Sequence, residues 1–223
     1  MIKFCTKIIK NIFTTFVRTC DYIISGRKEF SITTDGFDED KYPFINNLNI
    51  GKKILSITNE YISDRYSIVV INPVVLELVK SREKDFLNFT WKEENLGKYH
   101  SQKMINEKYH MIYIMSGLPI KRFKAIIAHE LMHAFLYEQK LFTDDQPCRE
   151  AMARWIEYKI LKDLHSKKDI EHILKIKSLK HGSGFKEIFK IEKKAKKKPL
   201  VRFLIENKEE ALNLQHMINN STT

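Results

Sequence analysis

The 223-residue sequence predicts an α+β fold in which a small sheet packs on one amphipathic helix and the C-terminal half is mostly helical. Two short apolar, β-branched runs, at residues 66–71 (YSIVVI) and 110–115 (HMIYIM), are typical of buried strands. After residue 119 the apolar residues instead recur at helical spacing. Hydrophobic residues at 43% and charged residues at 30% exclude a collagen-like, low-complexity or wholly disordered chain.

The N-terminal segment is predicted to form a cationic amphipathic helix, because apolar residues recur at helical spacing over residues 2–23 and basic residues fill the other face. Lys7, Lys10 and Arg18 interrupt every apolar run, so we expect no signal peptide or membrane span and an intracellular, cytoplasmic location. Such a helix can make peripheral contact with an anionic membrane, although a stripe of this kind more often packs on its own domain. Gly, Pro and acidic residues in segment 25–51 predict a linker.

Three parts follow from these patterns, namely an N-terminal helix with its linker (1–50), one folded domain (51–207) and a C-terminal tail (208–223). The helices expected within the domain lie from residue 52 onward and at 119–140, 147–164, 168–180 and 185–207, and the one at 119–140 has a broad apolar face. Pro119 suits the first turn of the strongest of these helices. Thr143, Asp144 or Asp145 can cap the helix that follows it.

The cysteine content and the charge distribution exclude several classes of protein. Cys5, Cys20 and Cys148 share no close pair, which excludes a disulfide scaffold and a zinc finger and favours a reducing compartment. The net charge of +11 is concentrated in residues 159–198, which carry 14 Lys and five acidic residues. Because no aromatic stacking pattern is interleaved with these lysines, we expect a solvated helix face and no nucleic-acid partner.

Residues 129–133 read His-Glu-Leu-Met-His on the strongest predicted helix. An α-helix turns about 100° per residue, so His129 and His133 differ by only about 40° in direction and roughly 6 Å along the axis, and both imidazoles can bind one metal ion. Neutral imidazole suits zinc. Glu130 cannot ligate the same ion, but its carboxylate can take a proton from a zinc-bound water that attacks a carbonyl.

A catalytic zinc usually has three protein ligands, so a third ligand is expected downstream. Leu136 and Gln139 stand where a metzincin would have glycine and histidine, which excludes that class. Glu150 lies on the next predicted helix, which a hairpin would return beside the first to give a His, His, Glu site. Asp144 and Asp145 are alternatives, although acidic residues just before a helix are more often caps.

Two further roles remain to be assigned around such a site. We expect the strand at 110–115 to bind the substrate backbone at an edge of the sheet, unless it is an ordinary half-buried strand. His181, Tyr158 and Arg154 are candidates for stabilising an oxyanion, a role that needs a donor about 3 Å from the developing charge. Of these three, His181 is the favoured catalytic residue.

The motif stands in a wider context that resembles a known family. The segments concerned are 115–119 (MSGLP), 126–136 (IIAHELMHAFL), 149–150 (RE) and 182–185 (GSGF). Over residues 50 to 205 or so, the chain resembles the DA-one-like zinc peptidase domain, a gluzincin-type, LIM-associated family. The resemblance implies a zincin-like fold, here without LIM or ubiquitin-interacting modules. It also implies zinc on His129, His133 and Glu150, with Glu130 as the base.

The expected function is therefore zinc-dependent hydrolysis of peptide bonds in a protein or peptide substrate, with Zn²⁺ as the cofactor. The alternative is a non-catalytic binding module of the same fold that uses its basic C-terminal half to hold an anionic partner. Glu130 favours the enzyme, because a binding module has no need of a general base.

Overall fold

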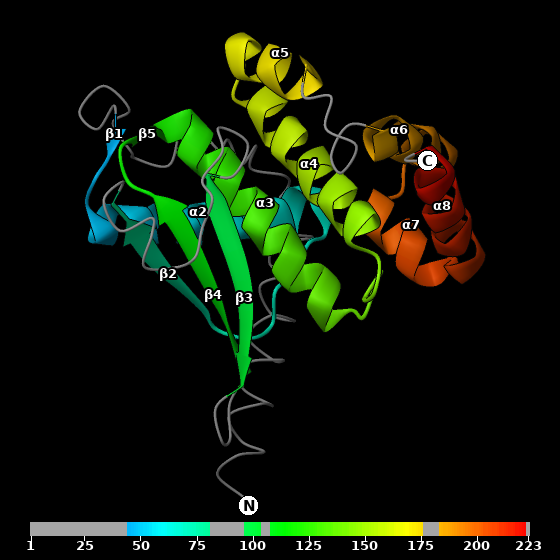
Figure 1. The fold of residues 1–223 in the computed structure, drawn as a ribbon, viewed down its shortest axis with the longest axis horizontal. Coiled ribbons are helices and arrows are strands. Elements are labelled where there is room, and N and C mark those ends of the chain that lie inside the picture. Colours follow the sequence, from blue (N-terminus) through cyan, green and yellow to red (C-terminus); the bar gives the residue numbers. More distant parts are fainter. Residues whose placement is uncertain (1–43, 81–95, 104–107, 176–182, 222–223) are drawn as a thin grey trace, which may run out of the picture.

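The computed structural model describes residues 44–80, 96–103, 108–175 and 183–221, and within these ranges the fold is α+β, as the sequence predicts (Figure 1). The helix expected over residues 2–23 lies outside the described residues. No helix in the described ranges combines the length and the apolar character that a membrane crossing requires.

The main sheet has three strands in the order β2-β4-β3, and their bounds are Val74–Val79 for β2, Gly97–Lys103 for β3 and Lys108–Met115 for β4. Strand β4 runs parallel to β2 and antiparallel to β3. Leu76, Ile112 and Ile114 lie buried on the face of this sheet that is covered by helices. A separate two-stranded ladder pairs β1 (Phe44–Ile45) with β5 (Leu118–Pro119).

Seven helices lie in the described residues, and they are α2 (Leu48–Tyr66), α3 (Ile120–Glu138), α4 (Gln146–Asp163), α5 (Lys167–Lys175), α6 (Ser183–Ala195), α7 (Leu200–Glu206) and α8 (Lys208–Ser221). Figure 1 shows α3 and α4 side by side, with the sheet on one side of this pair and α6 to α8 on the other. The helices predicted at 119–140 and 147–164 are thereby confirmed. Asp145 is the cap of α4, since its side chain accepts a hydrogen bond from the Cys148 backbone N–H at 2.9 Å.

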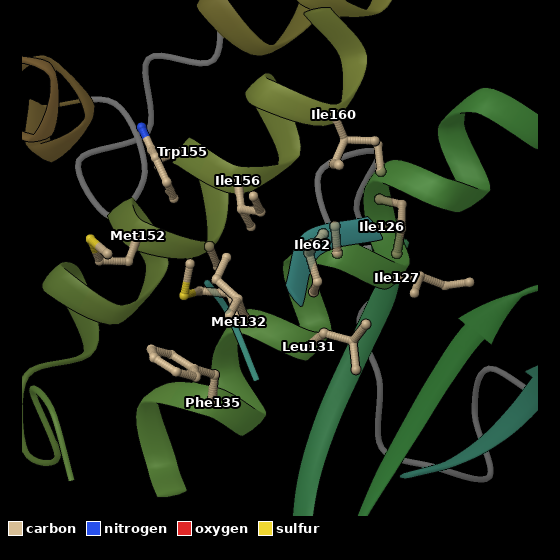
Figure 2. Packing of buried hydrophobic residues seen from close by; sticks show 14 of the residues in the cluster. Ile62, Ile126, Ile127, Leu131, Met132, Phe135, Met152, Trp155, Ile156 and Ile160 are labelled. Carbon is tan, nitrogen blue, oxygen red and sulfur yellow. The ribbon is translucent and has the colours of Figure 1, made fainter. Parts of the chain in front are cut away.

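Helix α3 forms the centre of the core (Figure 2). Its apolar side chains interlock with those of α4, and the labelled members of this layer are Ile126, Ile127, Leu131, Met132 and Phe135 from α3 and Met152, Trp155, Ile156 and Ile160 from α4. Each large apolar side chain buried in this way contributes roughly 1.5–3 kcal/mol. The helix that carries the His-Glu-Leu-Met-His motif is therefore packed between α4 and the sheet.

The strand predicted at residues 66–71 is wrong. Tyr66 is the last residue of α2, and Ser67 caps that helix in the left-handed conformation with φ 60°. Residues 67–71 form no strand, and within this run Ile68 is buried in the core whereas Ile71 is 76% exposed. The strand begins instead at Val74, directly after Pro73, whose ring removes a backbone donor that a sheet ladder would need.

The strand predicted at 110–115 is confirmed within β4, but its expected place at the edge of the sheet is wrong. Strand β4 pairs on both sides, with β2 and with β3. Strand β3, which the sequence did not predict because GKYHSQK is mostly polar, takes the edge beside α3. Its strand conformation comes from pairing with β4 rather than from its own composition.

The C-terminal part also differs from the prediction. The single helix expected at 185–207 is two helices, because Lys196 has φ 56° and Pro199 begins a new helix as its cap. The segment 208–223, expected as a tail, contains α8, which packs on α6 and α4. At the other end, α2 crosses the boundary expected near residue 50, since Asn47 caps it by accepting from the Asn49 N–H at 2.8 Å.

Candidate metal centre

Two imidazoles of α3 meet at one point. His129 and His133 lie one helical turn apart, and their Nε2 atoms are 3.2 Å from each other. Their side chains are only 10% and 13% exposed. The arrangement that the helical spacing predicts is therefore present.

Helix α4 brings a carboxylate to the same point, as it returns beside α3 (Figure 1). One oxygen of Glu150 lies 3.6 Å from Nε2 of His129, and the other lies 3.6 Å from Nε2 of His133. Ligand atoms of these three residues all lie within 4.8 Å of one another. Among the described residues, neither Asp144 nor Asp145 belongs to this group, since Asp144 is exposed and Asp145 is the cap of α4.

The donor set fits zinc. Four ligands placed tetrahedrally at 2.0–2.1 Å from zinc lie about 3.3 Å from one another. The separations of 3.2 Å between the two nitrogens and 3.6 Å from each nitrogen to the carboxylate are close to this value. Two imidazoles and one carboxylate leave a fourth position open, as in catalytic zinc sites.

Glu157 orients the first imidazole, a role that the sequence analysis missed. Its Oε2 lies 3.0 Å from Nδ1 of His129, and it is fully buried. Arg154 and Arg122 pair with the same carboxylate at 2.8 Å and 3.0 Å. A carboxylate on Nδ1 fixes the tautomer that leaves Nε2 free for a metal. The available signal was the seven-residue spacing from Glu150, which places both carboxylates on one face of α4.

An aromatic ring flanks the second imidazole. Tyr99 of β3 stacks on His133 with ring centroids 6.2 Å apart and an interplanar angle of 20°. Its hydroxyl lies 3.0 Å from Nδ1 of His110, whose Nε2 lies 2.8 Å from Glu138. Glu138 also accepts from the backbone N–H groups of residues 71 and 72 at 2.8 Å and 2.7 Å, which fixes this chain of contacts to α3.

Burial and charge shift the pKa values around the site. Burial raises the pKa of Glu130 to about 7, and burial lowers the pKa of His133 to about 3. Burial also acts to lower the pKa of His129, but hydrogen bonds to Glu150 and Glu157 outweigh it and raise that pKa to about 9. Although burial opposes the charge on Glu157, Arg154 and His129 hold its pKa at about 2.

The sequence analysis named His181, Arg154 and Tyr158 as candidates for stabilising an oxyanion. His181 lies outside the described residues. Arg154 is 3% exposed and is engaged with Glu157, and Tyr158 packs edge-on against Phe185 at 5.4 Å. Neither side chain is therefore part of the group of ligands.

The basic C-terminal helices carry ion pairs as well as exposed lysines. Lys190 pairs with Glu187 at 2.8 Å, Lys194 pairs with Glu210 at 3.2 Å, and Lys198 pairs with Glu206. These pairs are at least partly exposed, so each contributes little to stability. They offset part of the positive charge that the sequence assigns to this region.

Replacing Glu157 by Gln is expected to weaken zinc binding by about 10- to 100-fold, because His129 loses the anion that orients it. The same change leaves two buried arginines without their anion and should lower stability by about 3–5 kcal/mol. Chelator competition and thermal unfolding measure the two effects. Glu192→Gln is the matched control, since it removes a partly exposed pair with Lys159 at 2.7 Å. Zinc affinity equal to wild type in Glu157→Gln would show that Glu157 does not orient His129.

In comparisons with known proteins, no family model, no curated protein and no solved structure matches this chain.

Proposed function

We propose that this chain is a zinc-dependent peptidase with a zincin-type catalytic domain. The observation that carries the proposal is the convergence of His129, His133 and Glu150 within 4.8 Å, next in sequence to Glu130. The residue types match a zinc site with one open position, and Glu130 has no place among the ligands. The resemblance of four sequence segments to the DA-one-like peptidase domain points in the same direction.

Zinc bound to the three ligands would supply a Lewis acid that polarises a carbonyl and acidifies water. The protein's own groups perform the remaining tasks. Glu130 accepts a proton from the attacking water and returns it to the leaving amine. Glu157 keeps His129 in the tautomer that binds metal, and Tyr99 restrains the ring of His133.

Substrate binding is assigned to β3 rather than to β4. Because the Met115 N–H donates to the Leu96 carbonyl at 3.0 Å, the alternation of an antiparallel ladder turns the backbone groups of Gly97 and Tyr99 away from β4. In the described part of the chain this side of β3 has no strand partner. A peptide in extended conformation can pair there as an added strand, with its carbonyl beside the ligand group.

The alternative, a binding module without turnover, uses the basic C-terminal half. It is less well supported, because it gives no role to Glu130 and because several lysines of this half are already paired with glutamates. Retention of Glu130 next to the ligands favours the enzyme.

The test combines metal content with turnover. The purified chain should hold about one zinc per molecule, and it should cleave members of a peptide library in a manner abolished by a chelator and restored by added zinc. Cleavage that persists at full rate after complete removal of metal would contradict the proposal. A chain that binds no zinc would contradict it as well.

A further inference from the structure

The backbone of β3 passes unusually close to Glu130. A β-carbon at Gly97 would lie 2.5 Å from Oε1 of Glu130 and 2.6 Å from Cγ2 of Ile126. Both distances are shorter than van der Waals contact allows, so a larger residue at position 97 requires both side chains, or the strand itself, to move. The missing side chain of Gly97 makes the room that the carboxylate occupies.

Glu130 depends on this packing for its position. In the described ranges it makes no hydrogen bond or ion pair, although it is 4% exposed. Glu157 is different, because His129, Arg154 and Arg122 hold it from three sides. The carboxylate of Glu130 is therefore located by the surfaces around it, and the Cα of Gly97 is one of those surfaces.

The backbone at Gly97 does not itself require glycine. Position 97 belongs to β3 and opposes Ile114 in the ladder, and its φ lies outside the left-handed region. Glycine in a strand costs stability, because it adds unfolded-state entropy and contributes no packing. A glycine at such a place is typical of a close approach between the backbone and another group, and that group here is Glu130.

We propose that Gly97 is a positioning residue for Glu130. The inference rests on the proposed peptidase function, and it assigns to β3 a second task besides binding the substrate backbone. Any side chain at position 97 pushes the Glu130 carboxylate out of its place beside the ligand group. The three ligands themselves lie on α3 and α4 and are not in the path of that side chain.

The first experiment is Gly97→Ala. We expect zinc stoichiometry and chelator competition to match wild type, while kcat on a cleaved member of the peptide library falls at least about a hundredfold, the smaller end of what a general base contributes. A crystal structure of the metal-free variant should show the carboxylate displaced. His100→Ala is the matched control, because His100 lies on the same strand with its ring against Tyr113, on the opposite face.

A second set of variants separates catalysis from folding. Gly97→Ala also meets Ile126, and Ile126→Ala removes that clash but leaves a cavity that itself lowers stability. In that background the added methyl group should cost little further stability, while turnover should still fall. Glu130→Asp shortens the base. In the double variant with Gly97→Ala, the loss of turnover should therefore differ clearly from the sum of the losses in the two single variants, expressed as free energies.

The outcomes distinguish the inference from the proposed function. An unmoved carboxylate in the metal-free variant overturns the inference, and so does wild-type turnover in Gly97→Ala. Loss of zinc affinity equal to that of a ligand variant overturns it too, because position 97 would then act on the ligands. If the wild-type chain has no activity at all, the proposed function fails, while the crystal structure still decides whether Gly97 sets the position of Glu130.

Discussion

Zinc affinity is expected to fall by at least about a hundredfold when Glu150 is replaced by Ala, more than the loss of an orienting residue alone produces. Two imidazoles then remain, and neither they nor the orienting carboxylate of Glu157 supplies the missing ligand. Glu150→Gln keeps the size of the side chain and removes its negative charge, so affinity should fall there as well. Competition with a chelator measures both variants.

The controls for this prediction are the two rival acids before α4. Asp144→Ala removes an exposed side chain and should leave zinc affinity unchanged. Asp145→Ala removes the cap of α4 and a contact with Asn219 at 2.8 Å, so it should cost about 1 kcal/mol of stability with the metal retained. Release of zinc by either control, with retention in Glu150→Gln, would show that the third ligand is wrongly assigned.

The parts of the site that the sequence predicts are those set by one helix. Within a helix, the spacing of His129 and His133 fixes their relative direction, and the apolar residues around them fix which face is buried. The prediction of Glu150 as a ligand required one further inference, namely that a short connection joins two strong helices and returns the second beside the first. The loop from residue 139 to 145 provides it, and α4 returns along α3.

The parts that the sequence did not predict depend on contacts between elements. Strand β3 is polar and gains its conformation from β4, so neither Gly97 nor Tyr99 could be assigned to the site beforehand. Glu157 orients His129 across the interface of α3 and α4, and its seven-residue spacing from Glu150 places it on the same face of α4 without indicating which group it contacts. Residues 66–71 misled because their composition favours a strand, whereas α2 continues to Tyr66 and its cap is followed by an irregular segment in which Ile68 is buried and Ile71 is exposed.

Turnover is expected to fall by about a hundredfold to ten-thousandfold in Glu130→Gln, because the general base is lost while the ligands stay. Gln has nearly the same size, so it should fit between Ile126 and the backbone of Gly97. Since Glu130 makes no ion pair in the described part of the chain, its neutralisation leaves no buried cation behind. Folding and zinc content should therefore match wild type.

Measuring kcat on peptides that the wild type cleaves, alongside zinc content and thermal unfolding, tests this expectation for Glu130→Gln. His100→Ala serves again as the control with wild-type turnover. Equal kcat in Glu130→Gln and wild type would remove the general base from the mechanism and with it the proposed peptidase. A variant that also loses zinc would place Glu130 among the ligands, a role that the grouping of His129, His133 and Glu150 does not give it. Retained zinc with lost turnover is the result that separates an enzyme from a binding module, because only an enzyme needs a proton acceptor beside its ligands.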